Sequence, residues 1–223
     1  MLKSVVVAGV LVLGVGIAEA RAQGVEASIW GGWVFSDGVS VSTPVLGGDG
    51  NVYSRVDPKD SSVFGVNVGF FASESAEIGF MYSRQFSTLL FGGTADREVG
   101  DLNVDTYHGY FSYDFAMGEG RIRPFALIGF GATNYSQVDV TLVGVNRSLP
   151  GDTRFSTTWA AGVKFFAGPR VGARAMVRWT PTYIKSDPGG WWCDPFWGCY
   201  LAGDPQYSNQ FEISGGVTFR FVK

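Results

Sequence analysis

The sequence contains few residues that could carry out catalysis, and its single histidine, His108, is the first to consider. Serine–histidine catalysis needs a serine within hydrogen-bond distance of the imidazole ring and an acid that orients the ring. If the residues around His108 form a strand, Asp105 lies on the opposite face and Ser112 lies about 13 Å away along the strand. One histidine and two cysteines are also too few for the usual zinc sites. The sequence therefore predicts no catalytic residue, no metal site and no cofactor, and we interpret His108 as a lumen or girdle residue.

Charged side chains form the second group of candidates, because they recur at alternate positions within segments whose other positions are apolar. Four acids and four bases share this pattern: Glu26, Glu77, Asp114, Glu212, Lys164, Arg174, Arg178 and Arg220. Inside a narrow lumen, pairing between the two signs would offset the cost of removing these charges from water. On a soluble protein the same residues would form an ordinary solvated surface. The secondary structure and the connections around these residues are needed to choose between the two interpretations.

Eight segments of the chain alternate between apolar and polar residues with a period of two, which is typical of β-strands. These segments are residues 25–35, 63–71, 76–86, 103–115, 123–135, 155–165, 171–179 and 211–221. The fifth segment carries apolar residues on both faces, so we assign neither face to the interior. Only 17% of the residues are charged and 32 are glycine, which suits many strands joined by tight turns. With a formal net charge of −3, the composition excludes a basic nucleic-acid-binding protein.

The connections between these segments alternate strictly between short and long. Residues 73–75, 117–120 and 167–169 form short links, whereas residues 38–62, 90–102, 136–154 and 187–208 form long polar links that we expect to be loops. Barrels of the bacterial outer membrane show this alternation, because their periplasmic turns are short and their extracellular loops are long. The pattern favours an all-β fold, an eight-stranded antiparallel up-and-down transmembrane β-barrel, over a soluble periplasmic binder of the lipocalin type.

The N-terminal residues have the features of a secretory signal peptide. Lys3 precedes an uncharged apolar stretch, and the small residues Ala20 and Ala22 fit a cleavage site. The apolar stretch is shorter than the roughly 20 residues of a transmembrane helix, so a cleaved signal is favoured over an uncleaved anchor. We predict a signal peptide over residues 1–22 and a barrel domain over residues 23–223, exported to the outer membrane of a Gram-negative bacterium.

The last long link contains both cysteines and a group of aromatic residues. Cys193 and Cys199 are close in sequence in a chain predicted to be exported, so we predict a disulfide between them. The aromatic residues around them are Trp191, Trp192, Phe196 and Trp197. Exposed apolar groups of this kind often mark a contact surface, whereas the alternative is that the rings pack over the barrel mouth or lie at the lipid interface. These four residues are our candidates for contact with an extracellular partner.

In such a barrel the alternating charges point into the lumen. We expect Arg174 and Arg178 to pair with acids. Because the last strand lies beside both the seventh strand and the first, Glu212 and Glu26 are the favoured partners.

The chain resembles the small eight-stranded outer-membrane barrels of the outer-membrane protein A and X type. The features that carry the resemblance span nearly all of residues 23–223 and include Arg123-Pro124-Phe125, Gly129-Phe130-Gly131 and the closing run from Val217 to Phe221. Many barrels of this type end on an aromatic residue that the barrel-assembly machinery reads. This chain departs from that pattern, because Val222 and Lys223 follow Phe221.

The favoured function is non-enzymatic, either structural or in interaction at the cell surface. Side chains fill the interior of an eight-stranded barrel, which excludes a wide pore. Two alternatives within the membrane stay open, a narrow channel gated by the lumen charges and a lipid-modifying enzyme. Lipid A deacylases of this fold carry a His-x-Ser pattern, from which His108-Gly109-Tyr110 departs. The expected partners are outer-membrane lipids and the barrel-assembly machinery, with an extracellular partner at the last loop.

Overall fold

The computed structural model describes residues 24–46, 50–115, 121–142, 145–184, 193–194, 198–199 and 206–222, and the regular structure within these ranges is β-strand. No helix in this part of the chain is long and apolar enough to cross a membrane. The signal peptide predicted over residues 1–22 lies outside the described residues.

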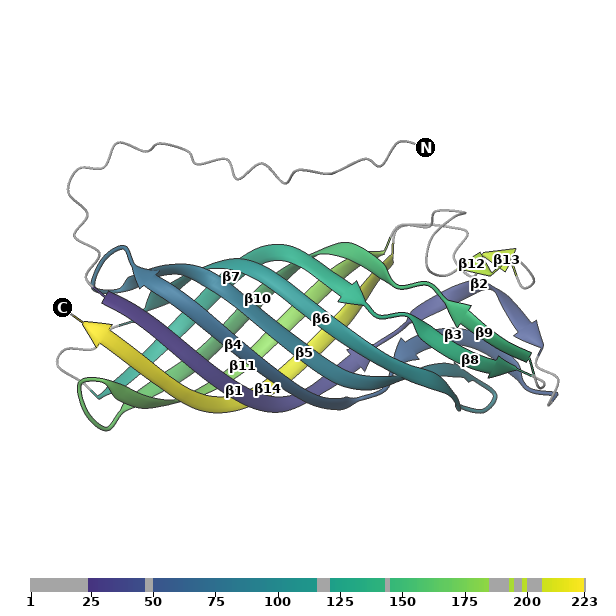
Figure 1. Ribbon diagram of the computed structural model, residues 1–223, viewed down its shortest axis with the longest axis horizontal. Helices are drawn as coiled ribbons and strands as arrows, with labels where there is room; N and C mark the ends of the chain where they lie inside the picture. The colour runs from purple at the N-terminus through teal and green to yellow at the C-terminus, as the bar shows by residue number, and fades with distance from the viewer. Residues whose placement is uncertain are drawn as a thin grey trace, which may run out of the picture.

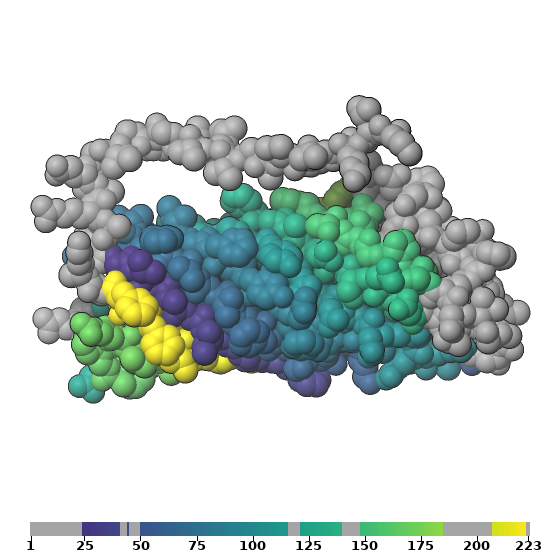
Figure 2. Space-filling view, viewed as in Figure 1, coloured from purple at the N-terminus to yellow at the C-terminus, as the bar shows by residue number. Residues whose placement is uncertain are grey.

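Eight long strands close into an antiparallel barrel, as the sequence predicts (Figure 1). They are β1 (Gly24–Asp37), β4 (Ser61–Phe71), β5 (Ala76–Gly93), β6 (Arg97–Asp114), β7 (Ile122–Tyr135), β10 (Asp152–Phe166), β11 (Val171–Ile184) and β14 (Gln206–Val222). Each strand pairs with its neighbour in this order, and β14 closes on β1 with Gly24 opposite Val222. The first and last strands therefore lie side by side at the surface (Figure 2).

Shorter strands lie at the end opposite Gly24 and Val222, where β2 and β3 extend the barrel sheet while β8 with β9 and β12 with β13 form separate two-stranded sheets (Figure 1). They are β2 (Val39–Leu46), β3 (Val52–Pro58), β8 (Val138–Leu142), β9 (Val145–Leu149), β12 (Cys193–Asp194) and β13 (Gly198–Cys199). β3 pairs with β5 beyond the point where β4 begins, and β5 and β6 continue together as far as Phe91 and Arg97. The prediction that residues 38–62, 90–102 and 136–154 are loops is thus wrong. Apolar residues such as Val56 and Leu102 recur within these polar stretches and are buried, which keeps the chain in strands.

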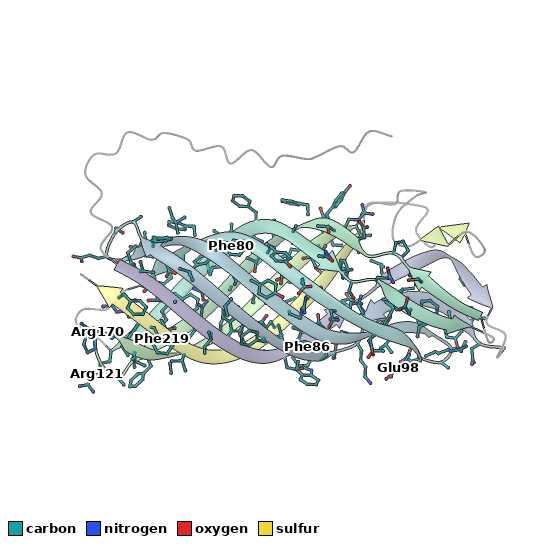
Figure 3. The ribbon with its side chains drawn as sticks, in the orientation of Figure 1. Phe80, Phe86, Glu98, Arg121, Arg170 and Phe219 are labelled. Carbon is teal, nitrogen blue, oxygen red and sulfur yellow. The ribbon has the colours of Figure 1, made fainter. Side chains whose placement is uncertain are left out.

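The outer and inner faces of the wall have the polarity of a membrane barrel. Large apolar side chains point outward, and Phe80, Phe86 and Phe219 do so visibly in Figure 3. Glu26 and Lys164, in contrast, are 0% and 1% exposed inside the barrel. A soluble lipocalin-like barrel would need an apolar interior and a polar exterior, so this arrangement excludes that alternative.

The faces of β7, which the sequence left open, are now assigned. Phe125 and Leu127 are buried in the lumen, whereas Ile128 and Phe130 are 42% and 68% exposed on the outside. Both faces are apolar because β7 passes through an apolar part of the lumen.

Glycines on the inner face make room for the large rings that fill the lumen. A Cβ atom added to Gly65 would lie 2.3 Å from the ring of Trp30, and one added to Gly162 would lie 2.7 Å from the ring of Phe125. Small and large residues therefore alternate across the lumen, as dense packing of a narrow barrel requires.

Replacing Gly65 with valine should destabilise the barrel by about 1–3 kcal/mol, because the new side chain would force the Trp30 ring out of its position. Chemical unfolding in detergent, followed by tryptophan fluorescence, measures the loss. Gly168→Val is the matched control, since nothing lies within 4 Å of a Cβ atom added at that position. Equal stabilities of the two variants would contradict the packing argument.

Candidate functional site

Four buried charges meet at the end of the lumen where the chain termini of the barrel lie. The Lys164 ammonium is 2.6 Å from Glu26 Oε1, 3.2 Å from Glu77 Oε2 and 3.1 Å from Asp114 Oδ1. None of these side chains is more than 2% exposed. Because they come from β10, β1, β5 and β6, one lysine connects strands on different sides of the lumen.

Arg220 on β14 completes this group. Its Nη2 atom is 2.7 Å from Glu26 Oε2 and 3.3 Å from Asp114 Oδ2. The guanidinium also stacks on the rings of Phe71 and Phe166, with Cζ 4.7 and 4.4 Å from the ring centroids. We call Glu26, Glu77, Asp114, Lys164 and Arg220 the Lys164 cluster. Three carboxylates share two cations here, so removal of either cation would leave unpaired negative charge.

Arg174 differs from its predicted role. Its Nη1 atom donates a hydrogen bond of 2.8 Å to Asn67 Oδ1, and its Cζ atom lies 4.7 Å from the centroid of the Phe125 ring. Within the described ranges it forms no ion pair with a carboxylate. The residues opposite it in register are Lys164 on β10 and Gly216 on β14, so neither neighbouring strand offers an acid at this level.

Arg178 forms the second ion pair of the lumen. It pairs with Glu212, which lies directly opposite it in the register of β11 and β14. The second carboxylate oxygen of Glu212 accepts a hydrogen bond of 3.0 Å from Trp30 Nε1. The Nη2 atom of Arg178 also donates to Ser83 Oγ over 2.8 Å. Both charges are therefore held by neutral partners as well as by each other.

Two apolar clusters fill the lumen at different heights. The first surrounds Arg174 and consists of Trp30, Met81, Tyr110, Phe125, Leu127, Ala160 and Met176. The second lies toward the extended end and consists of Val39, Val56, Leu89, Leu102, Val104, Tyr135, Val138 and Ile184. A cavity of about 10 Å³ beside Arg178 and Glu212 has room for roughly one water molecule. Among the described residues, the interior is thus packed at both of these levels.

Trp30 and Tyr110 are lumen residues that the sequence analysis did not predict. Trp30 is 2% exposed and Tyr110 is 4% exposed. The hydroxyl of Tyr110 donates to Glu77 and accepts a hydrogen bond of 2.8 Å from Asn67 Nδ2. The alternation with a period of two could have predicted their inward orientation, because it puts Trp30 on the same face as Glu26 and Tyr110 on the same face as His108.

His108 has a serine partner, Ser156, that sequence reasoning missed because it lies on another strand. The His108 Nε2 atom is 2.8 Å from Ser156 Oγ, and Thr133 Oγ1 lies 2.8 Å from the same hydroxyl. Both His108 and Ser156 are at most 1% exposed. The Nδ1 atom of the ring has no hydrogen-bond partner in the described part of the chain, where an orienting acid would bind in a catalytic triad. Nor do these ranges hold a group of three or more histidine, cysteine or acidic residues suited to a metal ion.

Comparison with known proteins finds structures of similar fold but low sequence identity. No family model and no curated protein matches the sequence. The outer-membrane protein OprG from Pseudomonas aeruginosa superposes with a TM-score of 0.61 at 12% identity, covering 91% of this chain and 97% of OprG. Neisserial surface protein A has a TM-score of 0.50 at 15% identity, with 89% of this chain and 96% of that one covered. The outer-membrane protein AlkL, determined in lipid bilayers, has a TM-score of 0.50 at 14% identity, with 90% and 92% covered.

The chain has the fold of a small eight-stranded outer-membrane β-barrel. The outward apolar belt agrees with the predicted location in the outer membrane. In such barrels the termini and the short turns face the periplasm. We therefore expect the Lys164 cluster to lie at the periplasmic end, and we expect the wall formed by β2, β3, β8, β9 and the far parts of β5 and β6 to be extracellular. We call this wall the extracellular extension.

Ion pairs lie on the surface of the extracellular extension. Arg55 pairs with Asp57 over 3.1 Å, and Lys59 pairs with Glu98 over 2.5 Å. Burial raises the pKa of Asp57, while the positive charge of Arg55 acts in the opposite direction. Glu98 lies at this end of the molecule in Figure 3.

The predicted disulfide and aromatic contact residues fall largely outside the described residues. The backbone of β12 pairs with that of β13 so that Cys193 lies opposite Cys199. This register brings the two positions together, as a disulfide requires, and the bond stays a prediction. Trp191, Trp192, Phe196 and Trp197 lie outside the described ranges.

Proposed function

We propose that this protein is a non-enzymatic outer-membrane barrel that acts at the cell surface through its extracellular extension. The observation that carries the proposal is the packed lumen combined with the long extracellular wall. The lumen contains buried charges with partners and two apolar clusters, so these side chains interact with one another within the lumen. The extension, in contrast, adds an ordered sheet beyond the apolar belt.

The packed lumen speaks against the channel alternative. A channel gated by charges would need the charged residues to line a path. Here the Lys164 cluster closes one level of the lumen and apolar clusters occupy the levels beyond it. Water and ions would have to displace packed apolar side chains at these levels, where polar side chains such as Arg174 and Arg178 already have partners within the protein.

The geometry around His108 speaks against the enzyme alternative. A general base must reach a substrate, whereas His108 and Ser156 are enclosed in the lumen. The pair also lacks an acid at Nδ1 within the described residues. We interpret it as part of a buried hydrogen-bond network that includes Thr133 and Thr182.

Planar-bilayer recording tests the closed lumen. We expect the folded protein to give no steady ion current, because the described side chains fill the lumen at the levels of the Lys164 cluster and of the two apolar clusters. A porin inserted in the same bilayers serves as the positive control. A steady current that changes when Glu212 is replaced by alanine would instead support the channel gated by lumen charges.

The proposed surface role also includes the last loop. A disulfide between Cys193 and Cys199 would hold the segment between them as a fixed turn and would present Phe196 and Trp197 to an extracellular partner with little loss of side-chain entropy on binding. Outer-membrane lipids around the apolar belt and the barrel-assembly machinery are the other partners that we propose.

Thiol labelling of intact cells tests this loop. With a membrane-impermeant reagent, we expect no labelling before reduction and strong labelling after it, because the two thiols should be oxidised and outside the cell. A Cys193→Ser variant should expose the free Cys199 thiol without reduction. Labelling of the unmodified protein before reduction would contradict the disulfide, and no labelling afterwards would contradict an exposed extracellular loop.

A further inference from the structure

The periplasmic end of the barrel contains a hollow lined by arginines. Its volume is about 460 Å³, and its lining includes Arg121, Arg123, Phe166 and Arg220. Arg170 adds a further exposed side chain beside it, and Figure 3 shows Arg121 and Arg170 at the same end of the barrel. The hollow is large enough for a small polar headgroup.

The backbone holds these arginines in place. The amide of Phe166 donates a hydrogen bond of 2.8 Å to the carbonyl of Arg121, and the amide of Arg220 donates one of 2.7 Å to the carbonyl of Arg170. Arg123 lies over the Phe166 ring, with Cζ 5.9 Å from the ring centroid. The positions of the arginines thus follow from the ends of β7, β10 and β14.

The charges at the two ends of the barrel are balanced differently. At the extracellular end, Arg55, Lys59, Arg84 and Arg154 each pair with a carboxylate. At the periplasmic end, Arg220 is paired within the Lys164 cluster, whereas Arg121, Arg123 and Arg170 have no carboxylate partner among the described residues. Among the described residues, the hollow is therefore bordered by arginines whose charge no carboxylate pairs with directly.

Two lipid-facing residues, Ile122 and Val171, directly adjoin these arginines in the chain, and a third, Phe165, lies opposite Ile122 in register. Ile122 is 55% exposed, Phe165 is 47% exposed and Val171 is 47% exposed on the outer face. An acyl chain that lies along these residues would bring its headgroup to the level of the hollow. A free phosphate ion would gain nothing from this apolar surface.

We propose that this hollow binds the phosphate headgroup of an anionic phospholipid from the periplasmic leaflet. Arg121 and Arg170 donate hydrogen bonds to the phosphate oxygens, and the side chains around Ile122 and Val171 contact the acyl chains. Guanidinium groups suit this task because their N–H donors match the geometry of phosphate oxygens. Basic pockets beside a membrane-spanning surface are a known form of headgroup recognition.

Native mass spectrometry of the folded full-length protein in neutral detergent tests the proposal. Phosphatidylglycerol and phosphatidylcholine are titrated separately, and bound lipid is counted. We expect phosphatidylglycerol to bind more tightly than phosphatidylcholine. The Arg121→Gln/Arg170→Gln double variant should weaken phosphatidylglycerol binding by about thirtyfold, because two charges near the headgroup are removed.

The matched control is Arg55→Gln/Lys59→Gln, which removes the same charge from exposed positions at the extracellular end. It should leave phosphatidylglycerol binding unchanged. Equal binding by the two double variants, or equal binding of the two lipids by the unmodified protein, would overturn the proposal. Displacement of phosphatidylglycerol by inorganic phosphate at a similar concentration would identify free phosphate as the ligand and would overturn the lipid assignment. Heat-modifiable gel mobility verifies that both variants are folded.

Discussion

Replacing Lys164 with methionine is expected to destabilise the barrel by at least about 3 kcal/mol, because the change leaves buried carboxylates without their shared cation. Methionine has a similar length and volume, so the loss reports the charge more than the packing. Glu26 and Asp114 would keep only Arg220 as a partner, and Glu77 would keep only the hydroxyl of Tyr110. Urea unfolding in lipid vesicles, followed by tryptophan fluorescence, measures the change in free energy.

The control for this variant is Lys59→Met, which removes the same charge from an ion pair whose side chains are 52% and 56% exposed. Exposed ion pairs contribute at most about 1 kcal/mol, so this variant should be close to the unmodified protein. If Lys164→Met and Lys59→Met lose the same stability, the Lys164 cluster does not have the structural role that its geometry indicates.

The pair of Arg178 and Glu212 should show strong coupling in a double-mutant cycle. Arg178→Met alone leaves a buried carboxylate without its cation, and Glu212→Gln alone leaves a buried guanidinium without its anion. Each single change is expected to cost about 3 kcal/mol or more. The double variant removes both charges, while the glutamine oxygen still accepts the hydrogen bond from Trp30. We expect it to be more stable than either single variant.

The same unfolding measurement gives the coupling energy, which should be at least about 2 kcal/mol. Ser83 does not distort the comparison, since its hydroxyl keeps Thr106 Oγ1 as a partner at 2.5 Å when Arg178 is removed. A double variant whose loss equals the sum of the two single losses would show that the two charges contribute independently.

The strand faces were predictable from the sequence because a period of two is a local property. It placed Glu26, Glu77, Asp114 and Lys164 on the inner face, where the structure has them. Register between adjacent strands was also accessible in part, and Glu212 was among the favoured partners for Arg178. Local patterns were therefore sufficient to predict the fold and to predict which charged residues face the lumen.

The partners across the lumen were not predictable, because they depend on the tilt and stagger of the closed barrel. Lys164 contacts Glu77 across 87 positions of sequence, and the alternation gives no height within the lumen for either residue. The predicted ion pair of Arg174 does not form for the same reason. At its height in the lumen, Arg174 contacts Asn67 and the rings of Trp30 and Phe125. The extracellular extension was missed because polar composition masked the continued alternation of residues such as Val56, Leu89 and Leu102.

The Lys164 cluster also bears on the order of events in folding. Its members come from β1, β5, β6, β10 and β14, and the bond between Arg220 and Glu26 joins residues 194 positions apart. The cluster is complete only when the last strand meets the first, whereas the hairpin of β5 and β6 can form from neighbouring residues alone. Interactions that form after the rate-limiting step slow unfolding and leave the folding rate almost unchanged. In a barrel whose first and last strands meet after the rate-limiting step, the cluster would set the unfolding rate and leave the folding rate nearly unchanged.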